Sequence, residues 1–119
     1  MHPFRAAVEA GDLDAATALL HPDCTFNSPA VFRAYEGKDA TAFVLRAVVD
    51  VFEDFAYIDE LVGGDTHGLV FTARVGDKSL TGWDYLRMED GLIREFTVMV
   101  RPLSALQALV AEMSARLGA

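Results

Sequence analysis

The chain has 119 residues, 52% of them hydrophobic, and its 10 Lys and Arg residues against 18 Asp and Glu residues give a net charge of -8. This length can bury a core without a disulfide or a structural metal, so we predict a single domain over residues 1–119. The one cysteine, Cys24, excludes an internal disulfide and a cysteine zinc site, and it favours a reducing, cytoplasmic location. The acidic segment 47–73, which has no Lys or Arg, argues against nucleic-acid binding, and no apolar run is long enough to cross a membrane.

The first part of the chain favours two short helices and a strand. Residues 4–10 are helix-prone and stop at Gly11, which can take the left-handed conformation that often follows a helix. Asp12 is placed to cap a second helix that continues through Leu20. Residues 24–28 then indicate a short strand.

A longer helix is predicted to begin at Asp39 as its N-cap, because apolar residues recur from there at spacings of three and four. These residues are Phe43, Val44, Ala47, Val48, Val51, Phe52 and Phe55. The same kind of spacing predicts a last amphipathic helix over residues 103–117.

Between these two helices the apolar period changes to two, which is typical of strands. Turn pairs separate four strand-like segments, at 56–62, 67–75, 79–88 and 92–101. Helices grouped before strands predict an α+β fold with an antiparallel meander. If the sheet curls around the long helix as a half-open cone, the inside of the cone is an apolar pocket that would account for the apolar excess.

Four motifs extend this interpretation: AGDLD at 10–14, FNSP at 26–29, YEGKDA at 35–40 and GWDYLR at 82–87. Together with the order of elements they resemble the nuclear transport factor 2-like superfamily, and within it small SnoaL-like, polyketide cyclase-like proteins. The resemblance implies a cone-shaped half-barrel of the cystatin-like type, in which a curved mixed sheet wraps around helices. The superfamily contains isomerases, cyclases, hydrolases and noncatalytic binding proteins, so the site has to decide the function.

Asp84 is the leading catalytic candidate, because it interrupts a hydrophobic strand and shares a face with Leu86. In an apolar pocket, burial would raise the pKa of this carboxyl group, and a neutral carboxylic acid can donate a hydrogen bond to a carbonyl or enolate oxygen. The resemblance implies the same hydrogen-bonding role for Asp84, since ketosteroid isomerases have an Asp at the matching point of this strand. The alternative is an Asp that local hydrogen bonds hold for structural reasons alone.

Other isomerase features are absent from the sequence. Ser28 stands where the family has its catalytic base, and Phe4 is approximately where the family has a tyrosine. Gly82 and Val98 stand where the epoxide hydrolases of this superfamily have polar residues. We therefore expect a pocket protein for a small apolar or aromatic metabolite, with cofactor-free acid/base chemistry of the isomerase, cyclase or dehydratase type. A noncatalytic binding domain and a dimeric assembly domain with a filled cavity remain the alternatives.

Further residues are expected around the ligand. The polar candidates are Ser28, Tyr35, Tyr57 and Arg101, and the apolar walls are Phe26, Phe43, Phe52, Leu86, Phe96, Val98 and Val100. Arg101 has two interpretations, a clamp for a ligand carboxylate or an ordinary surface ion pair. The three histidines are scattered along the chain, so we expect no metal site.

Trp83, Tyr85 and Arg87 alternate onto the strand face opposite Asp84. An exposed stripe of Trp, Tyr and Arg has the composition of an interface centre. Members of the superfamily commonly pair through this outer sheet face, so we predict a homodimer.

Overall fold

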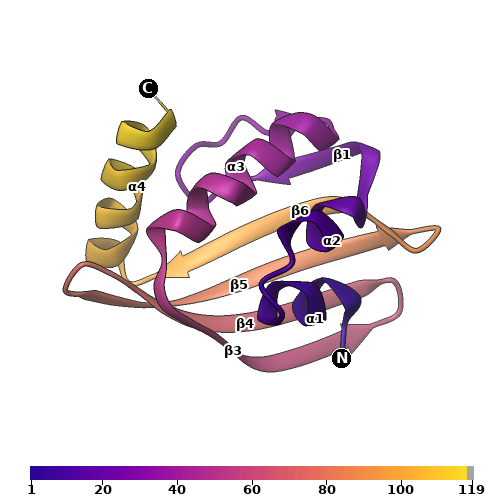
Figure 1. Cartoon of the computed structure of the whole chain (residues 1–119), viewed down its shortest axis with the longest axis horizontal. Coiled ribbons are helices and arrows are strands. Elements are labelled where there is room, and N and C mark those ends of the chain that lie inside the picture. The colour runs from indigo at the N-terminus through magenta and orange to yellow at the C-terminus, as the bar shows by residue number, and fades with distance from the viewer. Residues whose placement is uncertain (118–119) are drawn as a thin grey trace.

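The computed structural model describes residues 1–117 and has the expected α+β fold, in which four helices lie against one face of a curved six-stranded sheet (Figure 1). In chain order the elements are α1 (Pro3–Glu9), α2 (Leu13–Ala18), β1 (Leu20–Asn27), β2 (Tyr35–Glu36), α3 (Lys38–Val51), β3 (Glu53–Gly63), β4 (Thr66–Val75), β5 (Lys78–Glu89), β6 (Leu92–Arg101) and α4 (Leu103–Leu117). The last two positions of the expected domain, 118–119, lie outside the described residues. In the described part of the chain, no helix is both long enough and apolar enough to cross a membrane.

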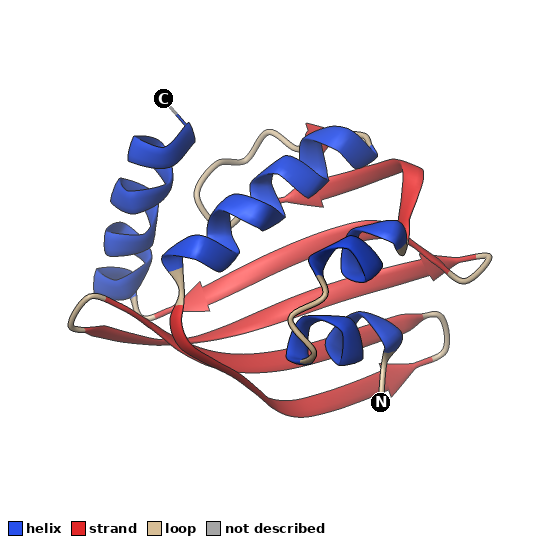
Figure 2. Ribbon diagram, viewed as in Figure 1, coloured by secondary structure: helices blue, strands red, loops and turns tan. Residues whose placement is uncertain are grey.

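The sheet is mixed and open, with the strand order β2-β1-β6-β5-β4-β3. Strands β3 to β6 form the expected antiparallel meander, and β1 adds to β6 in parallel. The turn between β5 and β6 is built by Asp90 and Gly91, both with positive φ, as a tight hairpin requires. Figure 2 shows that the helices lie above the hollow of this twisted sheet. The half-open cone is therefore confirmed.

The caps at the start of the chain are confirmed, but one boundary is wrong. Gly11 has φ 72, and the Asp12 side chain accepts a hydrogen bond from the backbone N–H of Ala15 at 3.0 Å. The second helix ends at Ala18 and not at Leu20, which instead begins β1. Strand β1 is longer than expected and contains Pro22, which has no N–H to donate. The pairing between β1 and β6 shifts register between Leu20 and Thr25, on either side of this proline.

The long helix differs from the prediction at both ends. Its N-cap is Gly37 and not Asp39, which lies in the first turn. The helix ends at Val51, where Phe52 becomes extended with φ -68 and ψ 134, and Phe55 already belongs to β3. The apolar spacing continues past the helix end because helix and strand pack on the same core, and no Gly or Pro marks the boundary.

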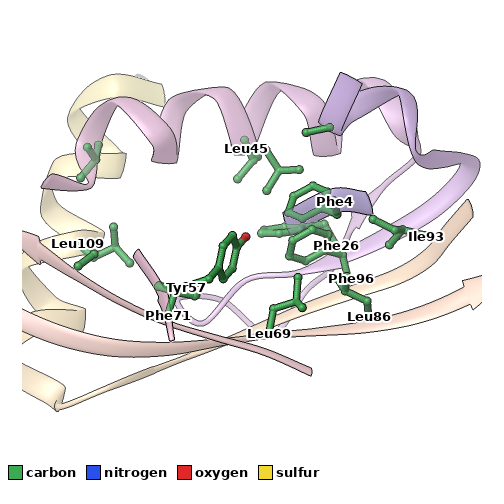
Figure 3. Packing of buried hydrophobic residues seen from close by; sticks show 14 of the residues in the cluster. Phe4, Phe26, Leu45, Tyr57, Leu69, Phe71, Leu86, Ile93, Phe96 and Leu109 are labelled. Atoms are coloured by element: carbon green, nitrogen blue, oxygen red, sulfur yellow. The ribbon is translucent and has the colours of Figure 1, made fainter. Parts of the chain in front are cut away.

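The core fills the space between the concave face of the sheet and the helices, as Figure 3 shows. Phe71, Leu69, Leu86, Ile93 and Phe96 are completely buried on the strands. The opposite face carries the exposed side chains of Trp83 and Met99. The indole ring of Trp83 covers Gly68, where an added Cβ would overlap it.

Candidate functional site

A cavity of about 660 Å³ lies between the concave face of the sheet and the helices. Its floor is aromatic, formed by Phe26, Phe52, Phe55, Tyr57, Phe71 and Phe96. Its roof comes from the four helices and from residues 28–31. This volume is typical of a site for a small organic molecule.

Asp84 and Tyr57 form a hydrogen-bonded pair inside this cavity. Asp84 lies on β5 with its side chain on the concave face, and it is 6% exposed. The Tyr57 hydroxyl, from the edge strand β3, donates to Oδ2 of Asp84 at 3.0 Å. Among residues 1–117 Asp84 is the only buried carboxylate, so this pair is the main polar feature of an otherwise apolar chamber.

Burial governs the protonation of both groups. It raises the pKa of Asp84 from 3.8 to about 7, although the hydrogen bond from Tyr57 works in the opposite direction by favouring the carboxylate. Burial also raises the pKa of Tyr57, and the negative charge of Asp84 adds to this effect, so the phenol stays protonated. Near neutral pH, Asp84 can therefore hold a proton while Tyr57 donates to one of its oxygens.

The N-terminal helix holds Tyr57 in place. The Arg5 guanidinium lies 5.9 Å from the centre of the Tyr57 ring, and it pairs with Glu9 at 3.2 Å and with Glu60 at 3.4 Å. The rings of Phe55 and Tyr57 also pack edge to face, with their centres 4.9 Å apart. The phenol is thus held by a cation and by an aromatic ring while its hydroxyl donates to the aspartate.

Two of the three histidines come together under α1. The rings of His2 and His67 meet edge to face with their centres 4.8 Å apart, and Nδ1 of His2 accepts a hydrogen bond from the backbone N–H of Phe4. Burial, followed by the charge of His67, lowers the pKa of His2. Within residues 1–117, no three His, Cys, Asp or Glu side chains converge as metal ligands would.

Most of the residues expected around the ligand line this cavity. They are Phe26, Ser28, Tyr35, Phe52, Tyr57, Asp84, Phe96 and Val98. The sequence pattern does not reveal the contact between Tyr57 and Asp84, because they come from strands that are not neighbours in the sheet. Curvature of the sheet brings their side chains together.

Four of the residues expected around the ligand do not line the cavity. Leu86 is 0% exposed and is enclosed by the core beside Phe96. Arg101 is exposed and lines a separate shallow groove of about 380 Å³ at the end of the sheet. Strand alternation places Arg101 on the face opposite Val98, and no bulge in this part of β6 turns it inward. Phe43 and Val100, which were expected as walls, also lie outside the cavity lining.

Several lining residues are missed by the sequence interpretation. Helix α4 contributes Leu106, Val110, Met113 and Leu117, whose apolar stripe is visible in the sequence but indicates only a packed face. Glu9 and Thr17 line the cavity from α1 and α2. No local pattern separates Glu9 from any other acidic residue at the end of a helix.

Comparison with known proteins identifies the family and the fold. The sequence model of the SnoaL-like domain matches residues 2–96. A steroid delta-isomerase from Pseudomonas aeruginosa is 44% identical, with a TM-score of 0.91 over 95% of this chain and 85% of that one. An uncharacterised protein with a cystatin-like fold from Silicibacter pomeroyi is 33% identical, with a TM-score of 0.91 over 99% and 87% of the two chains.

A more distant structure shares the fold alone. It is a protein from Catenulispora acidiphila with a ketosteroid isomerase-like fold, in complex with trimethylamine, and it is 15% identical. Its TM-score is 0.67 over 92% of this chain and 89% of that one. No curated protein matches the chain.

Proposed function

Because the chain belongs to the SnoaL-like domain family, we propose that it binds one small apolar molecule in the cavity and holds a carbonyl oxygen of that molecule with Asp84. The observation that carries the proposal is the buried hydrogen bond from Tyr57 to Oδ2 of Asp84. Since Tyr57 occupies one carboxyl oxygen, the proton on the other oxygen is free to be donated to a ligand. The apolar lining supports a ligand with few other polar groups.

The chemistry that fits this donor is acid/base isomerisation through an enol. When a proton leaves the carbon beside the carbonyl, negative charge develops on the oxygen, and a hydrogen bond from protonated Asp84 strengthens as it does so. A base must take the proton from carbon. Glu9 is the other carboxylate among the described lining residues, and we assign it the role of this base. The 44% identical relative, a steroid delta-isomerase, supports this class of reaction.

A noncatalytic binding domain is the second candidate, and Ser28 favours it. This residue stands where the isomerases of the superfamily have their base, and its Oγ accepts hydrogen bonds from the backbone N–H groups of Ala30 and Val31, both at 3.3 Å. A serine held in a turn in this way has no partner that would make it a base. The two candidates therefore differ in whether a bound ketone is enolised.

Deuterium exchange separates the two candidates. In D₂O, enolisation replaces the methyl protons of the acetyl group of 4-methylacetophenone by deuterium, and the loss of the proton NMR signal measures the rate. We expect the protein to accelerate the exchange, and Asp84→Asn to remove about 100-fold of that acceleration, because the donor acid is lost. Glu9→Gln should slow the exchange while leaving binding intact.

The control is Asp65→Asn, which changes an exposed carboxylate in a turn outside the cavity and should have no effect. Binding without accelerated exchange would support the noncatalytic candidate. Equal exchange rates in the wild type and in Asp84→Asn would contradict the proposed part of Asp84.

The same proposal includes a homodimer formed through the outer sheet face. Trp83 and Met99 are exposed there, and Tyr85, two residues after Trp83 on the same face of β5, is half-buried. Apolar side chains on a sheet face of this kind favour pairing with a second copy. The cytoplasmic location stays a prediction from the single thiol.

A further inference from the structure

We propose that the ligand has a linear aliphatic tail attached to its carbonyl head, and that helix α4 is the wall that selects the length of this tail. The inference rests on the proposed function, because it takes the pair formed by Tyr57 and Asp84 as the site of the head. It adds the chemical class of the ligand and the element that sets specificity.

The cavity is lined by aromatic side chains at its floor and mostly by aliphatic side chains at its roof. Every aromatic side chain that lines it comes from α1, from the strands, or from Phe52 at the junction of α3 and β3. The residues contributed by α3, by α4 and by segment 29–31 are aliphatic, apart from Ser114. Flat aromatic walls favour a planar, conjugated head, whereas flexible aliphatic side chains fit a chain that bends.

The aliphatic part reaches the surface. Val31 is 52% exposed and Val49 is 41% exposed, although both line the cavity. Met113 and Leu117, half-buried on α4, line it too. Exposed apolar side chains that continue into an internal cavity indicate a path along which an apolar chain can lie while its end approaches solvent.

Charged side chains are missing from this path. Helix α4 carries Glu112 and Arg116, but both are exposed and neither lines the cavity. From α3 and segment 29–31 the lining residues are likewise uncharged. A charged group on the part of the tail inside the cavity would find no partner along these walls, so that part of the tail is a plain hydrocarbon.

Helix α4 is placed to set the length of the tail. In Figure 1 it stands beside the end of α3, across the open end of the sheet. In the close-up of Figure 3, Leu109 of α4 lies at one end of the core, with Tyr57 between it and Phe96. Leu109 of this helix is 4% exposed and lines the cavity, so the buried face of α4 forms a wall at this end of the lining.

The test uses 4-alkylacetophenones whose tails run from methyl to decyl, with affinity measured by isothermal titration calorimetry. For the wild type we expect the affinity to rise by about fourfold for each added methylene group, which is the value of burying a methylene, until the tail meets α4. Met113→Trp fills the path and should end this rise at a shorter tail. Met113→Ala should extend it to a longer one. Leu103→Ala, at a 68% exposed position of the same helix outside the cavity, is the control and should leave the profile unchanged.

The outcomes distinguish this inference from the function on which it rests. Asp84→Asn should weaken binding of every member of the series by the same factor, because it acts on the head alone. If the short compounds bind and depend on Asp84, but longer tails bring no gain or both Met113 variants keep the wild-type profile, the inference is overturned and the proposed function stands. If no member of the series binds to the wild type, both are overturned. Circular dichroism of each variant checks that it is folded.

Discussion

At the scale of single residues, the raised pKa of Asp84 makes the free energy of unfolding depend on pH. Burial raises its pKa from 3.8 to about 7, so between these pH values the folded chain holds a proton that the unfolded chain has released. The contribution of Asp84 to stability is therefore greatest below about pH 4, falls as the pH rises to about 7, and is constant above that. We predict that Asp84→Asn removes this fall, because the amide does not titrate and can still accept the hydrogen bond from Tyr57.

The measurement is urea unfolding of both proteins below pH 4, between the two pKa values and above pH 7. The difference in unfolding free energy should shift in favour of the variant by up to about 4 kcal/mol across this range. Parallel pH profiles would mean that the pKa of Asp84 is not raised in the folded protein.

At the scale of elements, the contact between β4 and β5 shapes the cavity floor. Gly82 lies two residues before Asp84 on the same face of β5, where the ring of Phe71 from β4 covers it. An added Cβ at Gly82 would overlap that ring, so Gly82→Ala forces Phe71 to move toward the cavity. We predict a loss of about 1 to 3 kcal/mol in unfolding free energy, typical of overpacking, together with weaker ligand binding.

Urea unfolding and calorimetry with 4-methylacetophenone measure the two effects. Ser79→Ala, on an exposed position of the same strand, is the matched control and should change neither. An unchanged unfolding free energy in Gly82→Ala would show that Phe71 can move without destabilising the protein. It would also show that the glycine is not needed to form the cavity.

At the scale of the whole molecule, the predicted homodimer depends on the outer sheet face. We expect the wild type to sediment as a dimer at micromolar concentration, and Trp83→Glu to be a monomer, because a charge placed at the centre of an apolar interface has no partner there. Phe43→Glu is the control, since Phe43 is 62% exposed on α3, away from this face, and its substitution should leave the dimer intact. A wild-type monomer at that concentration would contradict the prediction.

The sequence alone determined the four helices, the antiparallel meander and the α+β class, because these follow from apolar periodicity, turn pairs and caps that act over a few residues. The curved, mixed sheet was implied by the family resemblance, and the short strand β2 was not predicted. It also singled out Asp84, since an acidic residue inside an apolar strand stands out without any partner. It missed the end of α3, where Phe52 and Phe55 keep the helical spacing after the backbone has become extended.

Only the tertiary structure decided which side chains meet. The hydrogen bond between Tyr57 and Asp84 depends on the curvature of the sheet, because the two residues are 27 positions apart on strands that are not neighbours. The enclosure of Leu86 and the exposure of Arg101 also depend on how the strands curl beneath the helices. The aliphatic wall of α4 belongs to the cavity because this helix packs across the end of the sheet. Periodicity reports which face of an element is buried, whereas the neighbour that buries it is set by packing between segments distant in the chain.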